Sequence, residues 1–134
     1  MKRIVIVGCA VRMLAFVSAL KSRFSDTHQI VGLFDIDPGK MRGFARRTGL
    51  DVSMFTDFDE MCDTIRPDMV IIGTVDCFHA GYVIRALDRK IAVVSEKPLC
   101  INMEQCREIL EAHHRNPEVF AVTSHKSRYR PVAR

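Results

Sequence analysis

The chain has 134 residues, of which 48% are hydrophobic and 27% charged, and it carries a formal net charge of +4. This size and composition predict one globular domain with a single core. No apolar run approaches the roughly 18 residues of a membrane span, so we expect no membrane partner.

The N-terminus and the cysteines bear on the compartment. The apolar run that starts at Ile4 is too short for a signal peptide and breaks at Arg12, with no small-residue cleavage site after it. The five cysteines are scattered and form no Cys-x-x-Cys pair, which favours free thiols over a disulfide framework or a zinc site. We therefore expect a cytoplasmic protein without a bound metal.

The excess positive charge lies near the C-terminus. Residues 111–134 hold five Lys or Arg against two Asp or Glu. This segment shows no aromatic interleaving and no recognisable nucleic-acid motif. We therefore expect no nucleic-acid partner.

Short apolar segments alternate with amphipathic segments along the whole chain. The apolar segments predict strands at residues 3–7, 29–35, 52–55, 68–74, 91–95 and 119–123. The amphipathic segments predict helices at residues 11–22, 38–48, 58–65, 78–89 and 103–115. Capping boxes are predicted at Asp57 with Glu60 and at Asn102 with Gln105.

This alternation predicts βαβ units, which build a parallel sheet with helices on both faces. Six strands and five helices fit the doubly wound α/β architecture, the Rossmann fold with strand order 3-2-1-4-5-6. We expect this dinucleotide-binding domain at residues 1–124. Residues 125–134 are polar and basic, and we expect them to begin the connection to a second, substrate-binding domain that is absent from this chain.

The first strand ends in a loop that contains part of a phosphate-binding fingerprint. Gly8 permits the tight turn, but Ala10 and Met13 replace the second and third glycines, and Cys9 lies between. Ala10 is small enough for a pyrophosphate to approach the backbone, whereas Met13 is expected to push the helix slightly away from the sheet. The helix N-terminus still offers free amides, and Arg12 could add a direct phosphate contact.

Asp35 closes the second strand, 22 residues after Met13. This spacing fits an acid that holds the adenine ribose hydroxyls. Its carboxylate repels a 2′-phosphate and favours NAD over NADP, although Lys40 and Arg42 lie nearby and weaken that preference. The alternative is a turn or cap residue before Pro38.

The loop after the fourth strand faces the cofactor from the other half of the sheet. Thr74 can offer its hydroxyl or its backbone to a dinucleotide. Asp76 is either a functional group or a helix cap. His79 either points toward the nicotinamide or packs as a hydrogen-bonded structural residue.

The fifth strand stops abruptly at Glu96, Lys97 and Pro98. Ligands of open α/β sheets gather at the carboxyl ends of such strands, so Lys97 is expected at the mouth of a cleft. Its ammonium can hold a substrate hydroxyl, or the alkoxide that develops from it, and take part in proton transfer. Glu96 is expected to orient Lys97, and a cis Lys97–Pro98 bond would aim the lysine into the cleft.

Together these residues resemble the N-terminal domain of the glucose–fructose oxidoreductase, inositol dehydrogenase and rhizopine-catabolism (Gfo/Idh/MocA) family. The motifs that carry the resemblance are Ile-Val-Gly at 6–8, Val-Gly-Leu-Phe-Asp-Ile-Asp-Pro at 31–38, Thr-Val-Asp-Cys-Phe-His at 74–79, Glu-Lys-Pro-Leu at 96–99 and His-Lys-Ser-Arg-Tyr-Arg-Pro at 125–131. The altered glycine loop departs from the family pattern, as does Lys126, where the family often has asparagine.

The resemblance implies NAD(P)-dependent oxidation or reduction of a sugar, cyclitol or related polyol. Gly8 and residues 9–13 would hold the pyrophosphate and Asp35 the ribose. Thr74 and His79 would line the dinucleotide cleft. Glu96 would contact the nicotinamide, and Lys97 would act on the substrate.

Family enzymes carry a second domain that supplies the acid–base residue and much of the substrate pocket. We therefore expect little turnover from this chain alone, and a face left uncovered predicts self-association into a homo-oligomer. Two alternatives remain open. One is a non-catalytic module that binds or senses dinucleotides, and the other is a Rossmann-like domain that binds no nucleotide.

Overall fold

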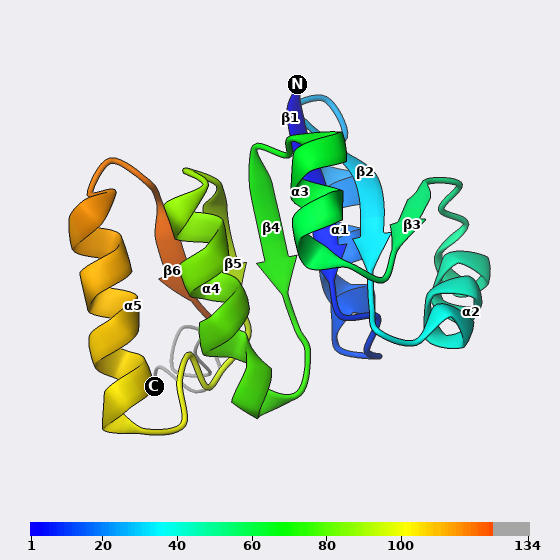
Figure 1. Ribbon diagram of the computed structural model, residues 1–134. Coiled ribbons are helices and arrows are strands. Elements are labelled where there is room, and N and C mark those ends of the chain that lie inside the picture. The colour runs from blue at the N-terminus through cyan, green and yellow to red at the C-terminus, as the bar shows by residue number, and fades with distance from the viewer. Residues whose placement is uncertain (125–134) are drawn as a thin grey trace, which may run out of the picture.

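A computed structural model describes residues 1–124 as a six-stranded parallel sheet flanked by helices (Figure 1). The predicted connection at residues 125–134, with Lys126, lies outside the described residues. The strand order is β3-β2-β1-β4-β5-β6, which confirms the predicted Rossmann topology.

The predicted elements are found with bounds that differ from expectation by no more than two residues. The strands are β1 (Lys2–Val7), β2 (His28–Phe34), β3 (Ser53–Phe55), β4 (Met69–Ile72), β5 (Ala92–Ser95) and β6 (Ala121–Thr123). The helices are α1 (Met13–Arg23), α2 (Pro38–Thr48), α3 (Phe58–Ile65), the 3-10 turn η1 (Asp76–Phe78), α4 (His79–Asp88) and α5 (Met103–Arg115). Among the described residues, no helix is long and apolar enough to cross a membrane.

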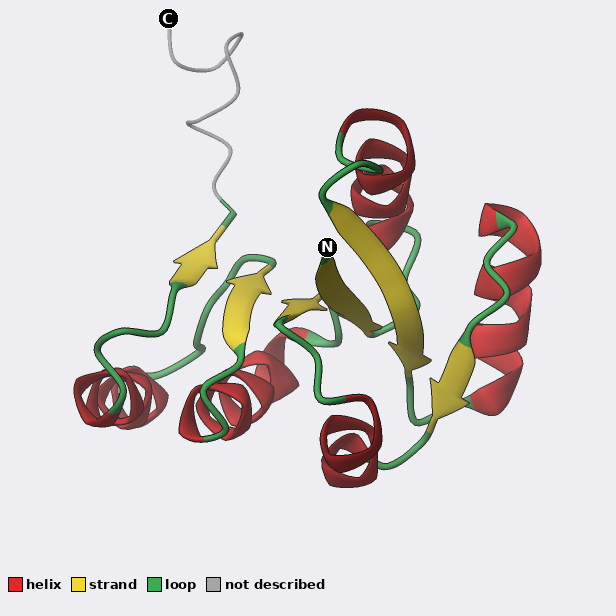
Figure 2. Ribbon diagram, turned by 90° about the horizontal axis from the view of Figure 1, so that it is seen from above, coloured by secondary structure: helices red, strands yellow, loops and turns green. Residues whose placement is uncertain are grey.

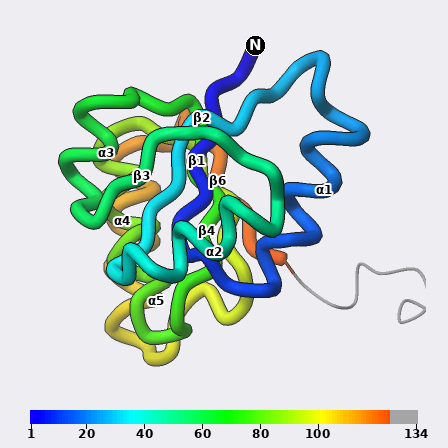
Figure 3. The backbone as a smooth tube through the Cα atoms, turned by 90° about the vertical axis from the view of Figure 1, so that its right-hand side faces the viewer, coloured from blue at the N-terminus to red at the C-terminus, as the bar shows by residue number. Residues whose placement is uncertain are grey.

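The helices cover both faces of the sheet, as Figures 2 and 3 show. Helices α1 and α2 pack on one face around Ile4 and Ile6, whereas α3, α4 and α5 pack on the other around Val5 and Val7. Successive side chains of β1 are therefore buried on opposite faces, as expected for the central strand of a doubly covered sheet.

Local cap chemistry fixes several helix ends. Pro38 begins α2, and Gly49 ends it in the left-handed conformation at φ 66°. Asp57 accepts a hydrogen bond from the Glu60 amide, and Asn102 does the same from Gln105, which is one half of each predicted capping box. The Gln105 side chain accepts from the Ile101 amide instead of from that of Asn102. Of the two alternatives for Asp76, the helix cap is not found, because this residue opens η1 and its side chain makes no cap hydrogen bond.

Met13 begins α1, and its side chain packs against the segment that follows β4. Its side chain is fully buried and lies over Gly73, just after β4. A Cβ added at Gly73 would lie 2.6 Å from the Met13 sulfur, so only glycine leaves room for this thioether. Gly73 thus provides space for the side chain that stands where the fingerprint has its third glycine. The displacement of α1 expected from Met13 stays a prediction.

This packing predicts a coupled pair of substitutions. Gly73→Ala is expected to cost about 1–3 kcal/mol by overpacking, and Met13→Ala about 2–5 kcal/mol by leaving a cavity. The double variant should lose less than the sum, because the shortened residue 13 makes room for the new methyl group. Urea unfolding measures all three, with Gly81→Ala as the control, since a Cβ at this helical position meets nothing within 4 Å. Strict additivity would contradict the packing.

Candidate cofactor-binding site

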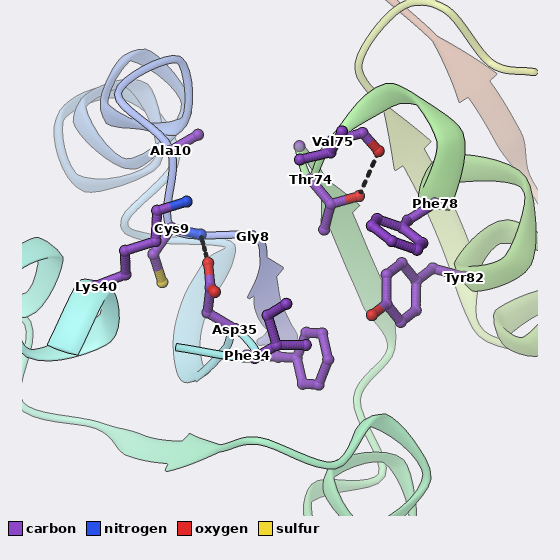
Figure 4. Close-up of a pocket in the computed structure, with 12 residues that line it drawn as sticks. Gly8, Cys9, Ala10, Phe34, Asp35, Lys40, Thr74, Val75, Phe78 and Tyr82 are labelled. Atoms are coloured by element: carbon purple, nitrogen blue, oxygen red, sulfur yellow. Dashed lines mark hydrogen bonds between the residues drawn. The ribbon is translucent and has the colours of Figure 1, made fainter. Parts of the chain in front are cut away.

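Two adjoining cavities lie at the carboxyl ends of the central strands. The first, of about 210 Å³, is shown in Figure 4 and reaches from Gly8 and Asp35 to Tyr82. The second, of about 250 Å³, reaches to Lys97 and shares Ala10 with the first. Nine of the ten predicted site residues line one or both: Gly8, Cys9, Ala10, Arg12, Asp35, Thr74, His79, Glu96 and Lys97. Met13 is the exception, because it is buried beneath the loop.

Gly8 forms the tight turn that brings two loops together. Its φ of 92° favours glycine, and its amide donates to the Phe34 carbonyl at 2.8 Å. An added Cβ would lie 2.7 Å from the carbonyl oxygen of Gly73. The loops after β1 and β4 therefore approach as closely as two backbones can.

Asp35 is fixed by backbone amides on both sides. One carboxylate oxygen accepts from the Cys9 amide at 2.9 Å, and the other accepts from the Asp37 amide at 3.0 Å. The residue is 7% exposed and lines the first cavity. The turn role that the sequence left open is thus present in the structure, and the spare lone pairs of the same carboxylate remain available to hydroxyl donors.

Cys9 faces the same cavity as an inert thiol. Burial raises its pKa to about 12, with a further contribution from the negative charge of Asp35. Burial likewise raises the pKa of Cys62 to about 11. Neither thiol is ionised near neutral pH.

Arg12 and Glu96 form an ion pair across the second cavity. The guanidinium Nε lies 3.4 Å from Glu96 Oε2, and the Arg12 side chain remains 48% exposed. The phosphate contact expected of Arg12 stays a prediction. Glu96 is 5% exposed, and its Oε1 has no hydrogen-bond partner among the described residues. Within that part of the chain Glu96 pairs with Arg12 and not with Lys97, so the predicted orienting contact between Glu96 and Lys97 is not present.

His79 joins the loops on either side of the second cavity. Its Nδ1 lies 2.6 Å from the Pro98 carbonyl and its Nε2 lies 3.0 Å from the Thr74 carbonyl. The side chain is 1% exposed. Its contacts are those of the hydrogen-bonded structural residue that the sequence offered as one alternative. They hold in place the segment that carries Lys97.

Lys97 itself is exposed at the edge of the second cavity, and the Lys97–Pro98 bond is cis, the isomer that the sequence analysis considered. Its ammonium is therefore accessible to a ligand in that cavity.

Sequence reasoning missed the apolar residues at the mouth of the first cavity. Ile36, Val75 and Phe78 are large side chains that are 72%, 63% and 52% exposed, respectively. They follow the same strand ends as the polar candidates, so position alone could have identified them. Exposed apolar side chains at a cleft suit the faces of a flat aromatic ligand.

The cleft lies at the carboxyl ends of the parallel strands and has a glycine turn, a fixed acid and apolar walls. These features define a dinucleotide-binding Rossmann domain. Residues 2–124 match the oxidoreductase family with an NAD-binding Rossmann fold (GFO_IDH_MocA), and the chain belongs to this family. The resemblance found from the motifs is thereby confirmed.

Similar proteins share this domain but are longer. The protein YteT of Bacillus subtilis (strain 168) is 31% identical over 139 residues, which cover 100% of this chain and 32% of YteT. The trans-1,2-dihydrobenzene-1,2-diol dehydrogenase of Xenopus laevis is 29% identical over 87% of this chain and 35% of its own length. The chain thus spans about a third of the length of these relatives.

Solved structures share the fold. The WlbA dehydrogenase from Bordetella pertussis, in complex with NADH and UDP-GlcNAcA, superposes with a TM-score of 0.86 at 20% identity, over 98% of this chain and 39% of that one. The scyllo-inositol dehydrogenase from Lactobacillus casei, with bound NAD(H) and scyllo-inositol, gives a TM-score of 0.81 at 19% identity, over 92% of this chain and 36% of that one.

The thiol environments predict selective alkylation. At pH 8, iodoacetamide should modify the exposed Cys77 readily and leave Cys9 and Cys62 unmodified in the folded chain, because their thiolates form only far above that pH. Mass spectrometry of the digested chain measures each site. Unfolding in urea is the control and should make all three react. Equal rates for Cys9 and Cys77 in the folded chain would contradict this assignment.

The ion pair predicts a measurable coupling. Arg12→Ala leaves the buried Glu96 carboxylate without its counter-charge and is expected to cost about 1–2 kcal/mol, less than a fully buried pair because Arg12 is half exposed. Glu96→Gln in the same chain should recover part of that loss. A double-mutant cycle in urea gives the coupling energy, with Arg12→Lys as the charge-preserving control. A coupling of zero would show that the pair is adventitious.

Proposed function

We propose that the chain is the cofactor-binding part of an NAD-dependent dehydrogenase that acts on a sugar, inositol or related polyol. The observation that carries this proposal is the convergence of a fixed acid and an exposed lysine on two adjoining cavities, with Asp35 in one and Lys97 in the other. Inositol 2-dehydrogenases of Burkholderia species among the relatives support the substrate class.

The residues present fit a dinucleotide. Within residues 1–124, the amides of Ala10, Val11 and Arg12 donate to no backbone carbonyl, and the first turn of α1 carries no acidic side chain. An anionic pyrophosphate is favoured at such a helix start. Asp35 would accept from the ribose hydroxyls, and the free oxygen of Glu96 would accept from an N–H donor in the second cavity.

The proposed chemistry is divided between cofactor and protein. When bound, NAD would supply the hydride acceptor. Lys97 would hold the substrate hydroxyl by hydrogen bonding, stabilise the negative charge that develops on its oxygen and take part in the transfer of its proton. His79 acts only through position, because its contacts with the Pro98 and Thr74 carbonyls hold the lysine segment.

The preference for NAD follows from the charge of Asp35. Its carboxylate repels a 2′-phosphate, whereas Lys40, which lines the same cavity, attracts one. Asp35 is fixed by two amides and the lysine is not, so we expect NAD to bind more tightly than NADP.

The isolated chain should turn over little substrate. Without walls that position a substrate against the nicotinamide, the reaction loses an orientation term of about 7–11 kcal/mol. The alternative function, a dinucleotide-binding or sensing module without catalysis, is favoured by the loss of two fingerprint glycines. Both the dehydrogenase proposal and the non-catalytic alternative predict that the chain alone is inactive. An NAD-reduction assay over a polyol panel therefore distinguishes these two functions only if a catalytic partner segment is added.

Cofactor titration tests the proposal. Calorimetry with NAD, NADH, NADP and NADPH should show binding that favours the NAD pair. Asp35→Asn should weaken NADH about tenfold, since a charge-assisted hydrogen bond becomes a neutral one, and should narrow the gap to NADPH. The exposed Asp26→Asn is the matched control. Absence of binding by all four dinucleotides would overturn the proposal.

A further inference from the structure

Two cysteines outside the cleft lie against each other where β5 connects to α5. Cys100 belongs to the segment of residues 96–102, which is neither helix nor strand, and Cys106 lies in the first turn of α5. Their side chains are hydrogen-bonded to each other, and both residues are half-buried. The site described so far gives neither thiol a role.

The hydrogen bonds at the start of α5 hold the segment of Cys100 against the helix. The Gln105 side chain accepts from the Ile101 amide at 3.0 Å, and the Gln105 amide donates to Asn102 Oδ1 at 2.8 Å. The Cys106 amide donates to the Asn102 carbonyl at 3.2 Å. These three bonds run between the segment and the first turn of the helix. The two thiols are therefore brought together by the folded backbone and not only by their closeness in sequence.

The other three cysteines are placed differently. Cys9 and Cys62 are buried on opposite faces of the sheet, and burial raises their pKa to about 12 and about 11, respectively. Cys77 is exposed in η1, and its carbonyl lies 3.5 Å from Gln105 Nε2, so its backbone is close to the start of α5. Cys77 is thus the competitor that an experiment on the pair has to exclude.

Two adjoining thiols can be oxidised to a disulfide bond by thiol–disulfide exchange. Partial burial and the neighbouring Cys106 raise the pKa of Cys100, so we assign the first attack to the Cys106 thiolate. It attacks one sulfur of oxidised glutathione, and one glutathione thiolate leaves. Cys100 then loses its proton, its thiolate attacks the Cys106 sulfur, and the second glutathione thiolate leaves. The pair has lost two electrons and two protons, and the oxidant has become two reduced glutathiones.

We propose that Cys100 and Cys106 are a modification site, at which a low-molecular-weight disulfide converts the two thiols reversibly into a disulfide bond. This inference is independent of the proposed function, since it needs no dinucleotide in the cleft. The sulfur atoms have to move from hydrogen-bond contact to about 2.0 Å, and Cys100 lies in a loop that can make this movement.

The bond would act on the segment that carries Lys97. That segment is already held on the side of α4, where His79 Nδ1 lies 2.6 Å from the Pro98 carbonyl. A disulfide between Cys100 and Cys106 would fix it covalently to α5 as well. Oxidation would therefore restrain the chain next to the proposed substrate-binding lysine without changing a residue of the cleft.

The test uses the full chain, with glutathione as the probe. The reduced chain is equilibrated with mixtures of reduced and oxidised glutathione, free thiols are trapped with N-ethylmaleimide, and the tryptic peptides are weighed by mass spectrometry. Both cysteines fall in one peptide, residues 91–107, because trypsin does not cleave between Lys97 and Pro98. Cys77 falls in another, residues 48–85.

We expect the peptide of residues 91–107 to lose the mass of two hydrogen atoms. The equilibrium constant for this oxidation should be about tenfold or more larger in the folded chain than in urea, where only the intervening residues keep the thiols close. Cys100→Ser should instead trap a mixed disulfide with glutathione on Cys106. Cys77→Ser is the matched control and should leave the constant unchanged.

Three results would overturn the inference. An equal constant in the folded and the unfolded chain would mean that the fold contributes nothing to the bond. A disulfide between the peptides of residues 48–85 and 91–107 would assign the reactive pair to Cys77. Glutathione carried on both Cys100 and Cys106 would show that the thiols do not reach each other. The comparison of the folded with the unfolded wild-type chain needs no variant, so it decides even where a serine variant fails to fold.

Discussion

The cleft depends on the close approach of two backbone segments, the loops that follow β1 and β4. At their meeting point the carbonyl of Gly73 occupies the space in which any residue other than Gly8 would carry its Cβ. Gly73 in turn receives the thioether of Met13 from above. The two glycines therefore let strands β1 and β4 carry their loops side by side with α1 packed directly over them. A side chain at position 8 would meet the Gly73 backbone and push the two loops apart where a doubly wound fold binds its ligand, whereas one at position 73 would displace the Met13 side chain.

Hydrogen bonds from two buried side chains connect the other walls of the cleft to the loops after β1 and β4. Asp35 joins the end of β2 to the first loop through the Cys9 amide, across 26 residues of sequence. His79 joins the second loop to the segment after β5 through two carbonyl contacts. Both residues are buried and both bond to backbone, so they fix the loops while leaving the cavity surface to other groups. The two cavities share Ala10, Gly73 and Thr74 in their walls, so the same contacts position both.

Much of this fold could be predicted from the sequence because its determinants are local. Alternating apolar segments give the strands, and Pro38, Asp57 and Asn102 mark helix starts through neighbouring amides. The membership of the cleft was also predictable, since the carboxyl ends of parallel strands meet at one edge. The pairings within it were not. The Arg12–Glu96 ion pair and the Met13–Gly73 packing join residues far apart in sequence, and each depends on side-chain directions that no spacing encodes. Asp76 failed as a cap for a related reason, because an extra turn of 3-10 helix delays the start of α4.

The charges of the cleft nearly cancel, and this changes what must hold an anionic ligand. Three acidic and three basic side chains line the two cavities, namely Asp35, Asp76, Glu96, Arg12, Lys40 and Lys97. The charge of Arg12 is partly offset by Glu96 at 3.4 Å, which weakens its attraction for a pyrophosphate. The remaining attraction for an anionic ligand depends on direction. It comes from the amides of the first loop and from the positive end of the α1 dipole, both of which act only over short distances. We therefore expect the shape of the loop to matter more for the affinity of an anionic ligand than the net charge of the cleft. That shape is fixed by the same approach of Gly8 to Gly73 that brings the strands together.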